Sequence, residues 1–356
     1  MQIVHDYRSL HTIPELDRTL PRTNAYIRRQ LASLKCQIFS PTPGSICAFF
    51  SFGHKKAIAF RADTDALPIF ERTSLPWKSQ HTGQMHACGH DGHTAILLEL
   101  ARRINREKFL PKNILLIFQP AEETTGGAEA ICNSGIFEKY SVSHIYALHL
   151  WPGLEKGYIY SKPACLMSQC TSITLRFTGR GGHIADAQHG CDALQACCTF
   201  YTASGYIKAP RPFLLKFGKI CGGTSGNILC NEAKLCGSLR TLEGNTEQQV
   251  RTALFNLCRQ TEKQTGCRCE IFYNNGYPAI ENDKALLYRI QKIHPIRILD
   301  EAYWTGEDFS FYQKKVPGVY FLLGLGSTPP LHSAEFSFDE TVLAKGVDFF
   351  WNLIEK

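Results

Sequence analysis

Short apolar runs that end in polar clusters recur between residues 57 and 152 of this chain. Three of them have the length of buried strands: Ala57 to Phe60 before Arg61–Asp65, Ile114 to Phe118 before Gln119–Glu123, and Ile145 to Leu148 before His149–Pro152. Helical patterns separate these runs, and strands that alternate with helices form α/β sheets. Because open α/β sheets carry their sites at the carboxyl ends of the strands, the polar clusters are the first candidates for chemistry.

The pattern changes at about Ser168, where a second set of elements begins. These elements follow one another as Thr171 to Thr178, Cys191 to Ile207, Phe213 to Ile220, Ala233 to Thr241, a helix with a capping box at Thr246 and Glu247–Gln249, and Cys269 to Tyr273. Their order is β-α-β-β-α-β, which is the ferredoxin-like order. After residue 276, a buried strand from Val319 to Leu323 and a closing helix with a capping box at Ser337 and Glu340 return to the first pattern.

We therefore predict an α/β fold with two domains, which also suits a length of 356 residues. Residues 1–167 and 276–356 form a discontinuous first domain with a mixed sheet flanked by helices. Residues 168–275 form an inserted ferredoxin-like α+β domain.

Charge and hydropathy exclude several classes of protein. The 39 Lys and Arg exceed the 32 Asp and Glu by only seven and are dispersed, so we expect no nucleic-acid partner. No apolar stretch approaches the roughly 18 residues that span a bilayer, and we expect no membrane partner. The N-terminal residues lack the pattern of a signal peptide, which predicts a cytoplasmic protein. The fifteen cysteines have no regular spacing, so we expect most to be reduced thiols packed as small hydrophobes.

The densest chemical cluster is His86-Ala-Cys88-Gly-His90-Asp91-Gly-His93, just before a helical pattern. A soft thiolate beside an imidazole suits Zn, Mn, Co or Ni better than Ca or Mg. The dipole of the following helix would help to hold Cys88 as a thiolate. Asp91 is expected to cap the helix or to orient an imidazole rather than to bind metal.

A second cluster is the pair Glu122 and Glu123 at the end of a predicted strand. Two adjacent anions at the rim of a buried sheet repel each other unless cations or protons offset them, and a metal ligand beside a general base would explain the pair. His149, at another strand end, and His332, in Leu331-His332-Ser333, are ambiguous when each is taken alone.

Taken together and in this order, the motifs resemble a known family. They are Tyr7–Glu15, Phe60–Pro68, His86–His93, Gln119–Glu123, Ala147–Pro152, Gly181–His183, Gly222–Asn227, Gly306–Phe309 and Leu331–Ser333, and they extend over nearly the whole chain. The chain resembles the metal-dependent amidohydrolases of peptidase family M20, in the group of aminoacylases, hippurate hydrolases and N-acetyldiaminopimelate deacetylases. This resemblance implies a zinc-peptidase-like catalytic domain, and it makes the inserted domain a lid or dimerisation domain.

The resemblance also implies the residues of the site. Its metal ligands would be Cys88, His90, Glu123, His149 and His332. Five ligands are too many for one catalytic zinc, so they imply two divalent ions (Mn, Zn, Co or Ni) that share a bridging ligand, most naturally Cys88.

The implied reaction is hydrolysis of the amide bond of an N-acyl-L-amino acid, with Glu122 as general base and then acid. His183 would stabilise the oxyanion, and Asn227 and Arg240 would hold the substrate carboxylate. In this family the lid histidine often comes from the partner subunit, which implies a homodimer.

Two positions in the predicted lid depart from the family pattern. Gln188 precedes His189 where proline is usual, and Cys230 stands third after Asn227 where proline is again usual. Both departures affect lid geometry and substrate specificity and leave every expected metal ligand in place.

Three alternatives remain open at this point. The first is a dipeptidase or aminopeptidase of the same fold. The second is a catalytically silent metal-binding or interaction protein, which would be expected to lack Glu122 or a ligand. The third is a cysteine-rich metal buffer or redox sensor, suggested by Cys197-Cys198 and by Cys267 with Cys269.

Overall fold

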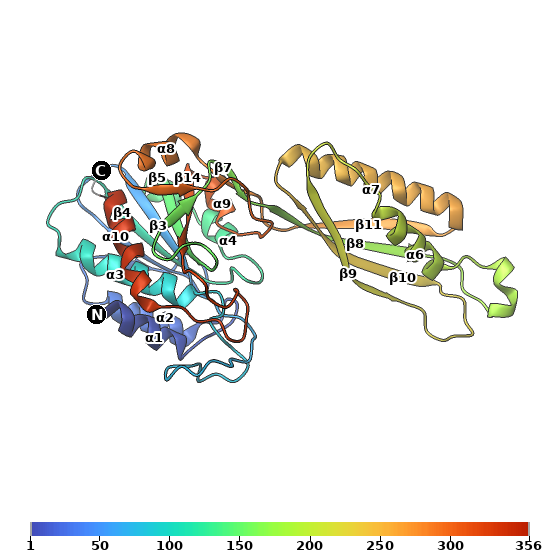
Figure 1. Ribbon diagram of the computed structural model, residues 1–356, viewed down its shortest axis with the longest axis horizontal. Coiled ribbons are helices and arrows are strands. Elements are labelled where there is room, and N and C mark those ends of the chain that lie inside the picture. Colours follow the sequence, from blue (N-terminus) through green and yellow to red (C-terminus); the bar gives the residue numbers. More distant parts are fainter. Residues whose placement is uncertain (1, 355–356) are drawn as a thin grey trace. The chain divides into compact units, whose positions relative to one another are not determined.

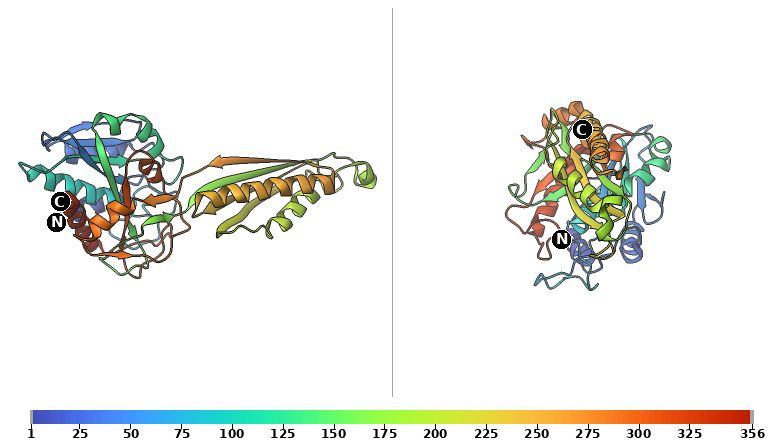
Figure 2. Two further views of the ribbon diagram at one scale, coloured as in Figure 1. Left: turned by 90° about the horizontal axis from the view of Figure 1, so that it is seen from above. Right: turned by 90° about the vertical axis from the view of Figure 1, so that its right-hand side faces the viewer.

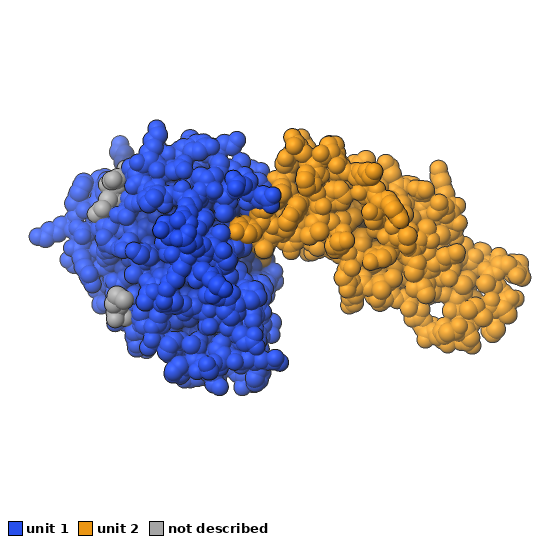
Figure 3. Space-filling view, viewed as in Figure 1, with its two compact units in different colours: residues 1–166, 280–301, 307–356 blue, residues 167–279, 302–306 orange. Residues whose placement is uncertain are grey.

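A computed structural model describes residues 2–354 of the chain, and its elements are labelled in Figure 1. The chain forms two compact units (Figure 3). Unit 1 contains the described residues up to Leu166, Ile280–Glu301 and those from Glu307 onward. Unit 2 contains Met167–Ala279 and the short segment Ala302–Gly306.

Unit 1 is built on a mixed eight-stranded sheet of order β1-β2-β4-β3-β5-β14-β6-β13. The strands are β1 (Gln37–Phe39), β2 (Ile46–Phe50), β3 (Ala57–Asp63), β4 (Asn113–Gln119), β5 (Val142–Trp151), β6 (Ile159–Ser161), β13 (Ile296–Ile298) and β14 (Gly318–Gly324). The central strands β4, β3, β5 and β14 are parallel to their neighbours within this group. Their carboxyl ends therefore meet at one edge of the sheet.

Helices pack on the sheet of unit 1 in two groups. The first group is α1 (Gln2–His11), α2 (Pro21–Leu31), α3 (His90–Arg106) and α10 (Leu343–Ile354), and the second is α4 (Ala128–Asn133), α5 (Ile136–Lys139) and α9 (Ser310–Gln313). Residues Ile58, Phe60 and Ala62 of β3 share one core with the first group. All seven residues of β3 are buried, which is the pattern of a strand covered on both faces.

The remaining elements of unit 1 are one helix, one 3-10 turn and a two-stranded sheet. They are α8 (Lys284–Gln291), the 3-10 turn η2 (Glu340–Val342), and the two-stranded sheet of β7 (Ala164–Met167) and β12 (Ile280–Asn282). Leu286, Leu287 and Ile290 of α8 belong to the core that contains α10.

Unit 2 has the element order β-α-β-β-α-β and a four-stranded antiparallel sheet of order β11-β8-β10-β9. Its elements are β8 (Gln169–Thr178), the 3-10 turn η1 (Ile184–His189), α6 (Ala193–Ser204), β9 (Phe213–Gly222), β10 (Glu232–Thr241), α7 (Gly244–Thr265) and β11 (Arg268–Asn275). Along β8, buried residues such as Ile173, Leu175 and Phe177 alternate with more exposed ones. Both helices contact this buried face (Figure 2). The predicted fold class is confirmed.

The structure corrects three details of the sequence analysis. Helix α7 begins at Gly244, so Thr246 lies inside its first turn and does not cap it. At the C-terminal helix the capping side chain is Asp339, which accepts the N–H of Thr341, and not Ser337. Helix α3 begins at His90 with Gly89 at its N-cap, so Asp91 is a first-turn residue.

No helix within residues 2–354 combines the length and the apolar character needed to cross a membrane. All fifteen cysteines are free thiols. Seven of them are buried as small core residues, fewer than the majority that the sequence analysis expected.

Candidate metal centre

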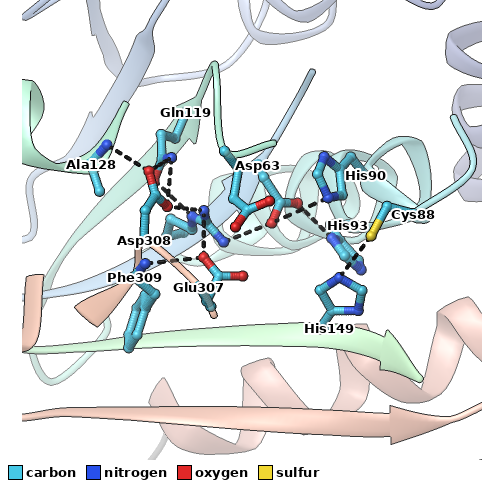
Figure 4. Close-up of polar contacts among 12 residues, drawn as sticks. Asp63, Cys88, His90, His93, Gln119, Ala128, His149, Glu307, Asp308 and Phe309 are labelled. Carbon is cyan, nitrogen blue, oxygen red and sulfur yellow. Dashed lines mark hydrogen bonds and ion pairs between the residues drawn. The ribbon is translucent and has the colours of Figure 1, made fainter. Parts of the chain in front are cut away.

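Polar residues at or after the carboxyl ends of β3, β4, β5 and β14 gather at one edge of the sheet of unit 1. Figure 4 shows Asp63, Cys88, His90 and His149 among them. Cys88 and His90 enter this edge from the turn before α3, Glu122 and Glu123 follow β4, and His149 lies near the end of β5. His332 arrives on the loop after β14. The structure thus brings together all six residues for which the sequence suggested metal binding or general base catalysis.

Gly89 shapes the turn that carries Cys88 and His90. Its φ of +81° is a conformation that residues with a side chain rarely adopt, and a Cβ there would lie 3.3 Å from Leu150 Cδ1. This turn ends at the N-terminus of α3 and leaves the Cys88 thiol and the His90 ring both buried.

Hydrogen bonds fix which nitrogen of each imidazole is free. His90 Nδ1 lies 2.8 Å from the Asp65 carbonyl oxygen, and His149 Nδ1 lies 2.8 Å from the Leu150 carbonyl oxygen. A carbonyl only accepts, so both Nδ1 atoms carry a proton, and Nε2 is the nitrogen through which each ring can bind a metal. His90 Nε2 is buried with no hydrogen-bond partner in the described part of the chain, and His149 Nε2 lies 3.4 Å from Cys88 Sγ. A buried, unshared lone pair is what a metal ligand requires.

His93 is different because both of its nitrogens are already used. Its Nδ1 donates to Asp63 Oδ1 at 2.6 Å, and its Nε2 accepts the N–H of Leu150 at 2.9 Å. Although His93 belongs to the dense motif of the sequence, it is a structural residue that ties α3 to β3 and β5.

The side chain of Asp65 holds the turn that contains Glu122 and Glu123. Its two carboxylate oxygens accept the N–H of Glu122 at 3.0 Å and the N–H of Glu123 at 3.1 Å. The preceding residue, Ala121, has a φ of +61°, which is unusual for a residue with a side chain. The sequence analysis noted Asp65 as part of a polar cluster but did not assign it this role.

His332 also adopts a left-handed backbone conformation, with a φ of +64°. Its N–H donates to the Ala87 carbonyl at 2.8 Å, which ties the loop to the Cys88 turn. Its Nε2 lies 3.1 Å from Glu123 Oε1. Such strained residues cluster at functional sites, where the surrounding structure holds them in place.

Five groups of three side chains in unit 1 have potential ligand atoms within 4.8 Å of one another. They are Cys88 with His90 and His149, Cys88 with Glu123 and His332, His90 with Glu122 and Glu123, Asp63 with His90 and His93, and Glu122 with Glu307 and Asp308. The first two groups share Cys88, as two ions with a bridging thiolate would require.

Hydrogen bonds disqualify the last two groups. Asp63 is engaged by His93 through Oδ1 and by Arg61 through Oδ2, at 2.7 Å. Asp308 accepts from backbone and side-chain nitrogens on both oxygens, and Glu307 accepts from Arg61 and Tyr320. Carboxylates already saturated with donors in this way have little capacity left for a cation.

The electrostatics of the site favour a cation. Burial opposes protonation of His90, but Asp63, Asp65 and Glu123 outweigh it and raise the pKa of His90 to about 10. Burial raises the pKa of the Cys88 thiol well above its usual value, and Glu123 and Glu122 raise it further. A thiolate at this edge therefore needs a nearby positive charge, which a bound cation would supply.

Behind the centre lies a buried ionic network that the sequence analysis did not predict (Figure 4). Arg61 donates to Asp63 at 2.7 Å and to Asp308 at 2.8 Å, and lies 3.0 Å from Glu307. Asp308 also accepts from Gln119 at 2.7 Å. Two features of the sequence could have predicted this network: the charged Arg61 at the end of the apolar run of β3, and the Gly306–Phe309 motif. A charge buried in a strand must be paired, and the acidic residues of that motif are possible partners.

A second buried network lies around Asp91. Asp91 Oδ2 is 2.6 Å from His11 Nδ1, and Asp91 Oδ1 accepts the N–H of Gly92 at 2.8 Å. His11 Nε2 lies 3.3 Å from Glu71 Oε1. The sequence analysis expected Asp91 to cap the helix or to orient an imidazole. Asp91 does orient an imidazole, but it is that of His11 and not that of a candidate metal ligand.

The other predicted site residues, His183, Asn227 and Arg240, all belong to unit 2. His183 is exposed and its Nδ1 accepts the N–H of Ala185, and it forms an antiparallel bridge with Ile228, next to Asn227. Arg240 lies near the far end of β10 and donates to Cys170 Sγ at 2.8 Å and to the Trp304 carbonyl at 3.1 Å.

The length of β10 separates these residues within unit 2. His183 and Asn227 lie before the start of β10 at Glu232, and Arg240 is eight residues further along the strand, about 26 Å at 3.3 Å per residue. One copy of unit 2 therefore does not gather all three around a single small molecule.

The two departures from the family pattern occupy different environments. Gln188 is exposed in η1, next to a kink at Asp186. Cys230 is buried, and its thiol donates to the Glu232 carbonyl at 3.1 Å. The Cys230 carbonyl also accepts the N–H of Ala193 at the start of α6.

A buried group of cysteine, imidazole and carboxylate side chains at the carboxyl edge of an α/β sheet, beside a further buried carboxylate, is typical of metal-dependent hydrolases. Comparison with known proteins agrees with this class. Residues 59–356 match the model of "Peptidase family M20/M25/M40".

Two relatives of known name match nearly the whole length of the chain. An N-acetyldiaminopimelate deacetylase of Streptococcus uberis (strain ATCC BAA-854 / 0140J) is 33% identical over 96% of this chain and 94% of its own length. One from Geobacillus sp. (strain WCH70) is 32% identical over 98% of this chain and 96% of its own length.

Solved structures lead to the same family. The Bacillus subtilis YXEP protein, described as a dinuclear metal binding peptidase from the M20 family, superposes with a TM-score of 0.88 at 28% identity, over 99% of this chain and 96% of its own. The chain belongs to peptidase family M20/M25/M40 and is a metal-dependent amidohydrolase of that family.

Proposed function

We propose that the protein hydrolyses the amide bond of N-acyl-L-amino acids and releases a carboxylate and a free amino acid. The single observation that carries this proposal is the pair of ligand groups that share Cys88, with Glu122 beside them. N-acetyldiaminopimelate is the first substrate to test, because two relatives that match nearly the whole chain are named as its deacetylases.

The proposed metal ligands are Cys88, His90, Glu123, His149 and His332. The free Nε2 lone pairs of His90 and His149 and the negative potential around them support two divalent ions, with Mn, Zn, Co and Ni as the metals to test. When bound, such ions polarise a substrate carbonyl and make a water molecule more acidic.

Glu122 is the proposed general base and acid. It is buried, and its backbone is fixed by Asp65. Burial, with Glu307 and Glu123, raises the pKa of its carboxyl well above the usual value. A carboxylate with a raised pKa can accept a proton from the attacking water and return it to the amine nitrogen as the amide bond breaks.

Unit 2 is the proposed lid and dimerisation domain, within the predicted bounds 168–275. His183 would stabilise the oxyanion, and Asn227 and Arg240 would hold the substrate carboxylate. The distance along β10 supports a homodimer, in which Arg240 of one chain works with the partner subunit's His183 and Asn227. A cytoplasmic location also remains a prediction from the sequence.

The test combines metal analysis with a substrate panel. Purified protein is analysed for metal by mass spectrometry, and amino acid release is measured from N-acetyl, benzoyl and N-acetyldiaminopimelate substrates with Mn, Zn, Co or Ni. We expect about two ions per chain and release that a chelator abolishes. Release from free dipeptides but from no acylated amino acid would replace this proposal with the dipeptidase alternative.

The variant Glu122→Gln tests the mechanism. It should lower kcat by roughly 10²–10⁴-fold and leave the metal content near that of the wild type. The matched control is Glu129→Gln, an exposed glutamate in the first turn of α4, which should change neither quantity. Full activity of Glu122→Gln would show that another group acts as the base.

A further inference from the structure

A cluster of basic side chains lies at the edge of the sheet of unit 1 opposite the metal centre. Lys56 immediately precedes β3, Lys112 immediately precedes β4, and His144 is the third residue of β5. Strand β3 pairs in parallel with both β4 and β5, so the amino ends of these three strands lie side by side. Arg289, in the last turn of α8, is the fourth member, because its charge acts on both Lys112 and His144.

The register of the strands fixes this arrangement. The Lys56 carbonyl accepts the N–H of Asn113 at 3.2 Å, which places the residue before β3 next to the start of β4. His144 pairs with Ile58, the second residue of β3. Lys112 Nζ lies 3.2 Å from His144 Nε2, so the ammonium group donates to a neutral imidazole.

Within residues 2–354, no ion pair compensates the positive charges of this cluster. Lys56, Lys112 and Arg289 form no ion pair with any described residue. By contrast, nearby arginines such as Arg102 and Arg103 are paired with carboxylates. The carboxylate that precedes α8, Asp283, is used as its cap and accepts the N–H of Leu286 at 2.7 Å.

The pKa values of Lys112 and His144 are both lowered. Burial lowers the pKa of Lys112, and the positive charges of Arg289 and Lys56 lower it further. Burial and the charge of Lys112 lower the pKa of His144, a hydrogen bond with the Ser143 backbone opposes them, and Arg289 and Lys56 lower it further, to about 4. The groups that lower both pKa values are cations, as a local positive potential would require.

We propose that Lys56, Lys112, His144 and Arg289 form a binding site for a phosphate group. Cations that repel one another cost free energy, and an anion of two negative charges offsets more of that cost than a single carboxylate does. The ammonium and guanidinium groups supply several N–H donors to a tetrahedral oxyanion, and the guanidinium matches two of its oxygens at once. The site is independent of the amidohydrolase centre, because its residues lie at the opposite ends of the same strands.

Inorganic phosphate and glycerol 3-phosphate are the probes, titrated into the metal-loaded enzyme by calorimetry with chloride at equal ionic strength as the reference. The double variant Lys112→Gln/Arg289→Gln should bind phosphate at least tenfold more weakly than the wild type, and each single variant roughly three- to tenfold more weakly. Tighter binding of glycerol 3-phosphate would identify a phosphate ester as the ligand, and tighter binding of inorganic phosphate would identify the free anion.

Two controls separate this site from the metal centre. Lys345→Gln, an exposed lysine of α10 that has no ion pair among the described residues, should bind phosphate like the wild type. The double variant should retain full amidohydrolase activity, because none of its changed residues belongs to the proposed catalytic centre.

A spectroscopic readout reports on the site directly. Bound phosphate should raise the pKa of His144 by at least one unit in an NMR titration of the imidazole, with the resonance assigned from His144→Gln. Equal phosphate affinity in the wild type and the double variant would overturn the proposal. So would an effect of phosphate no larger than that of chloride, which would identify an adventitious ion only.

Discussion

Asp308 anchors both sides of the turn that presents Glu122 and Glu123, and its removal gives a sharp test of this packing. Its carboxylate accepts hydrogen bonds from Arg61 at 2.8 Å, from Gln119 at 2.7 and 2.9 Å, and from the N–H groups of Gly127 and Ala128 at 2.9 and 3.0 Å. Gln119 precedes the turn, and Gly127 and Ala128 follow it. One buried side chain thus joins β3, β4 and the start of α4.

The cost of Asp308→Ala can be worked out from these contacts. Two buried N–H groups lose their acceptor, at about 1–2 kcal/mol each. Arg61 loses one of three anionic partners but keeps Asp63 and Glu307, which adds roughly 1 kcal/mol. The sum is about 4 kcal/mol, within the roughly 3–5 kcal/mol measured when one partner of a buried ion pair is removed.

Urea unfolding followed by tryptophan fluorescence measures this change, because three of the four tryptophans, Trp77, Trp151 and Trp351, lie in unit 1. The control is Asp348→Ala, which removes an exposed carboxylate 2.9 Å from Arg103 and should cost less than about 0.5 kcal/mol. A loss below about 1 kcal/mol for Asp308→Ala would refute the view that this carboxylate anchors the turn.

Three further predictions follow from the same structure. Asp65→Ala leaves the N–H groups of the Glu122–Glu123 turn without an acceptor, so kcat at saturating metal should fall roughly 10–100-fold, as steady-state assays would show. Removal of metal by a chelator should lower the unfolding free energy by about 3 kcal/mol or more, and Cys88→Ser should abolish most of this difference in thermal melts. The folded-state pKa of His144 is about 4, against 6.5 when unfolded, so the unfolded chain binds more protons between these values and stability should fall as pH drops through that window. Since His144 is only half-buried, the loss should be roughly 1 kcal/mol, and His144→Gln should show a flatter pH dependence in urea titrations.

The sequence predicted the parts of the fold that depend on local pattern. Strand β8 alternates in burial along Ile173, Leu175 and Phe177, and such a period of two is visible without a structure. The short edge strands β1 and β13 and the helices α4 and α9 carry too few residues for a clear period, and the sequence analysis did not predict them.

The helix starts were harder to predict than the helices. Thr246 and Gln249 have the spacing of a capping box, but α7 begins two residues before Thr246, at Gly244. Glu247, in the first turn, accepts hydrogen bonds from Thr171 of β8 at 2.7 Å and from Arg251, one turn further along α7, at 2.9 Å. The local motif therefore did not predict where the helix begins.

The candidate site likewise has features that the sequence predicts and features that only the structure shows. Cys88, His90 and Glu122 stand out in the sequence because their chemistry is concentrated in short motifs. His93 stands in the same motif as Cys88 and His90, yet both its nitrogens are hydrogen-bonded, and only the structure shows that. Which imidazole keeps a free lone pair depends on the neighbouring acceptor, and a spacing along the chain does not encode it.

Both edges of the central sheet in unit 1 carry concentrated charge, of opposite sign. The carboxyl edge collects carboxylates such as Asp63, Glu122 and Glu123, and the amino edge collects Lys56 and Lys112. The same parallel strands produce both clusters, because residues placed just before or just after neighbouring strands are brought side by side. At the carboxyl edge the excess negative charge is the feature that attracts divalent cations. By the same reasoning, the excess positive charge at the amino edge should attract an anion. The phosphate titration therefore tests independently how charge is distributed along these strands.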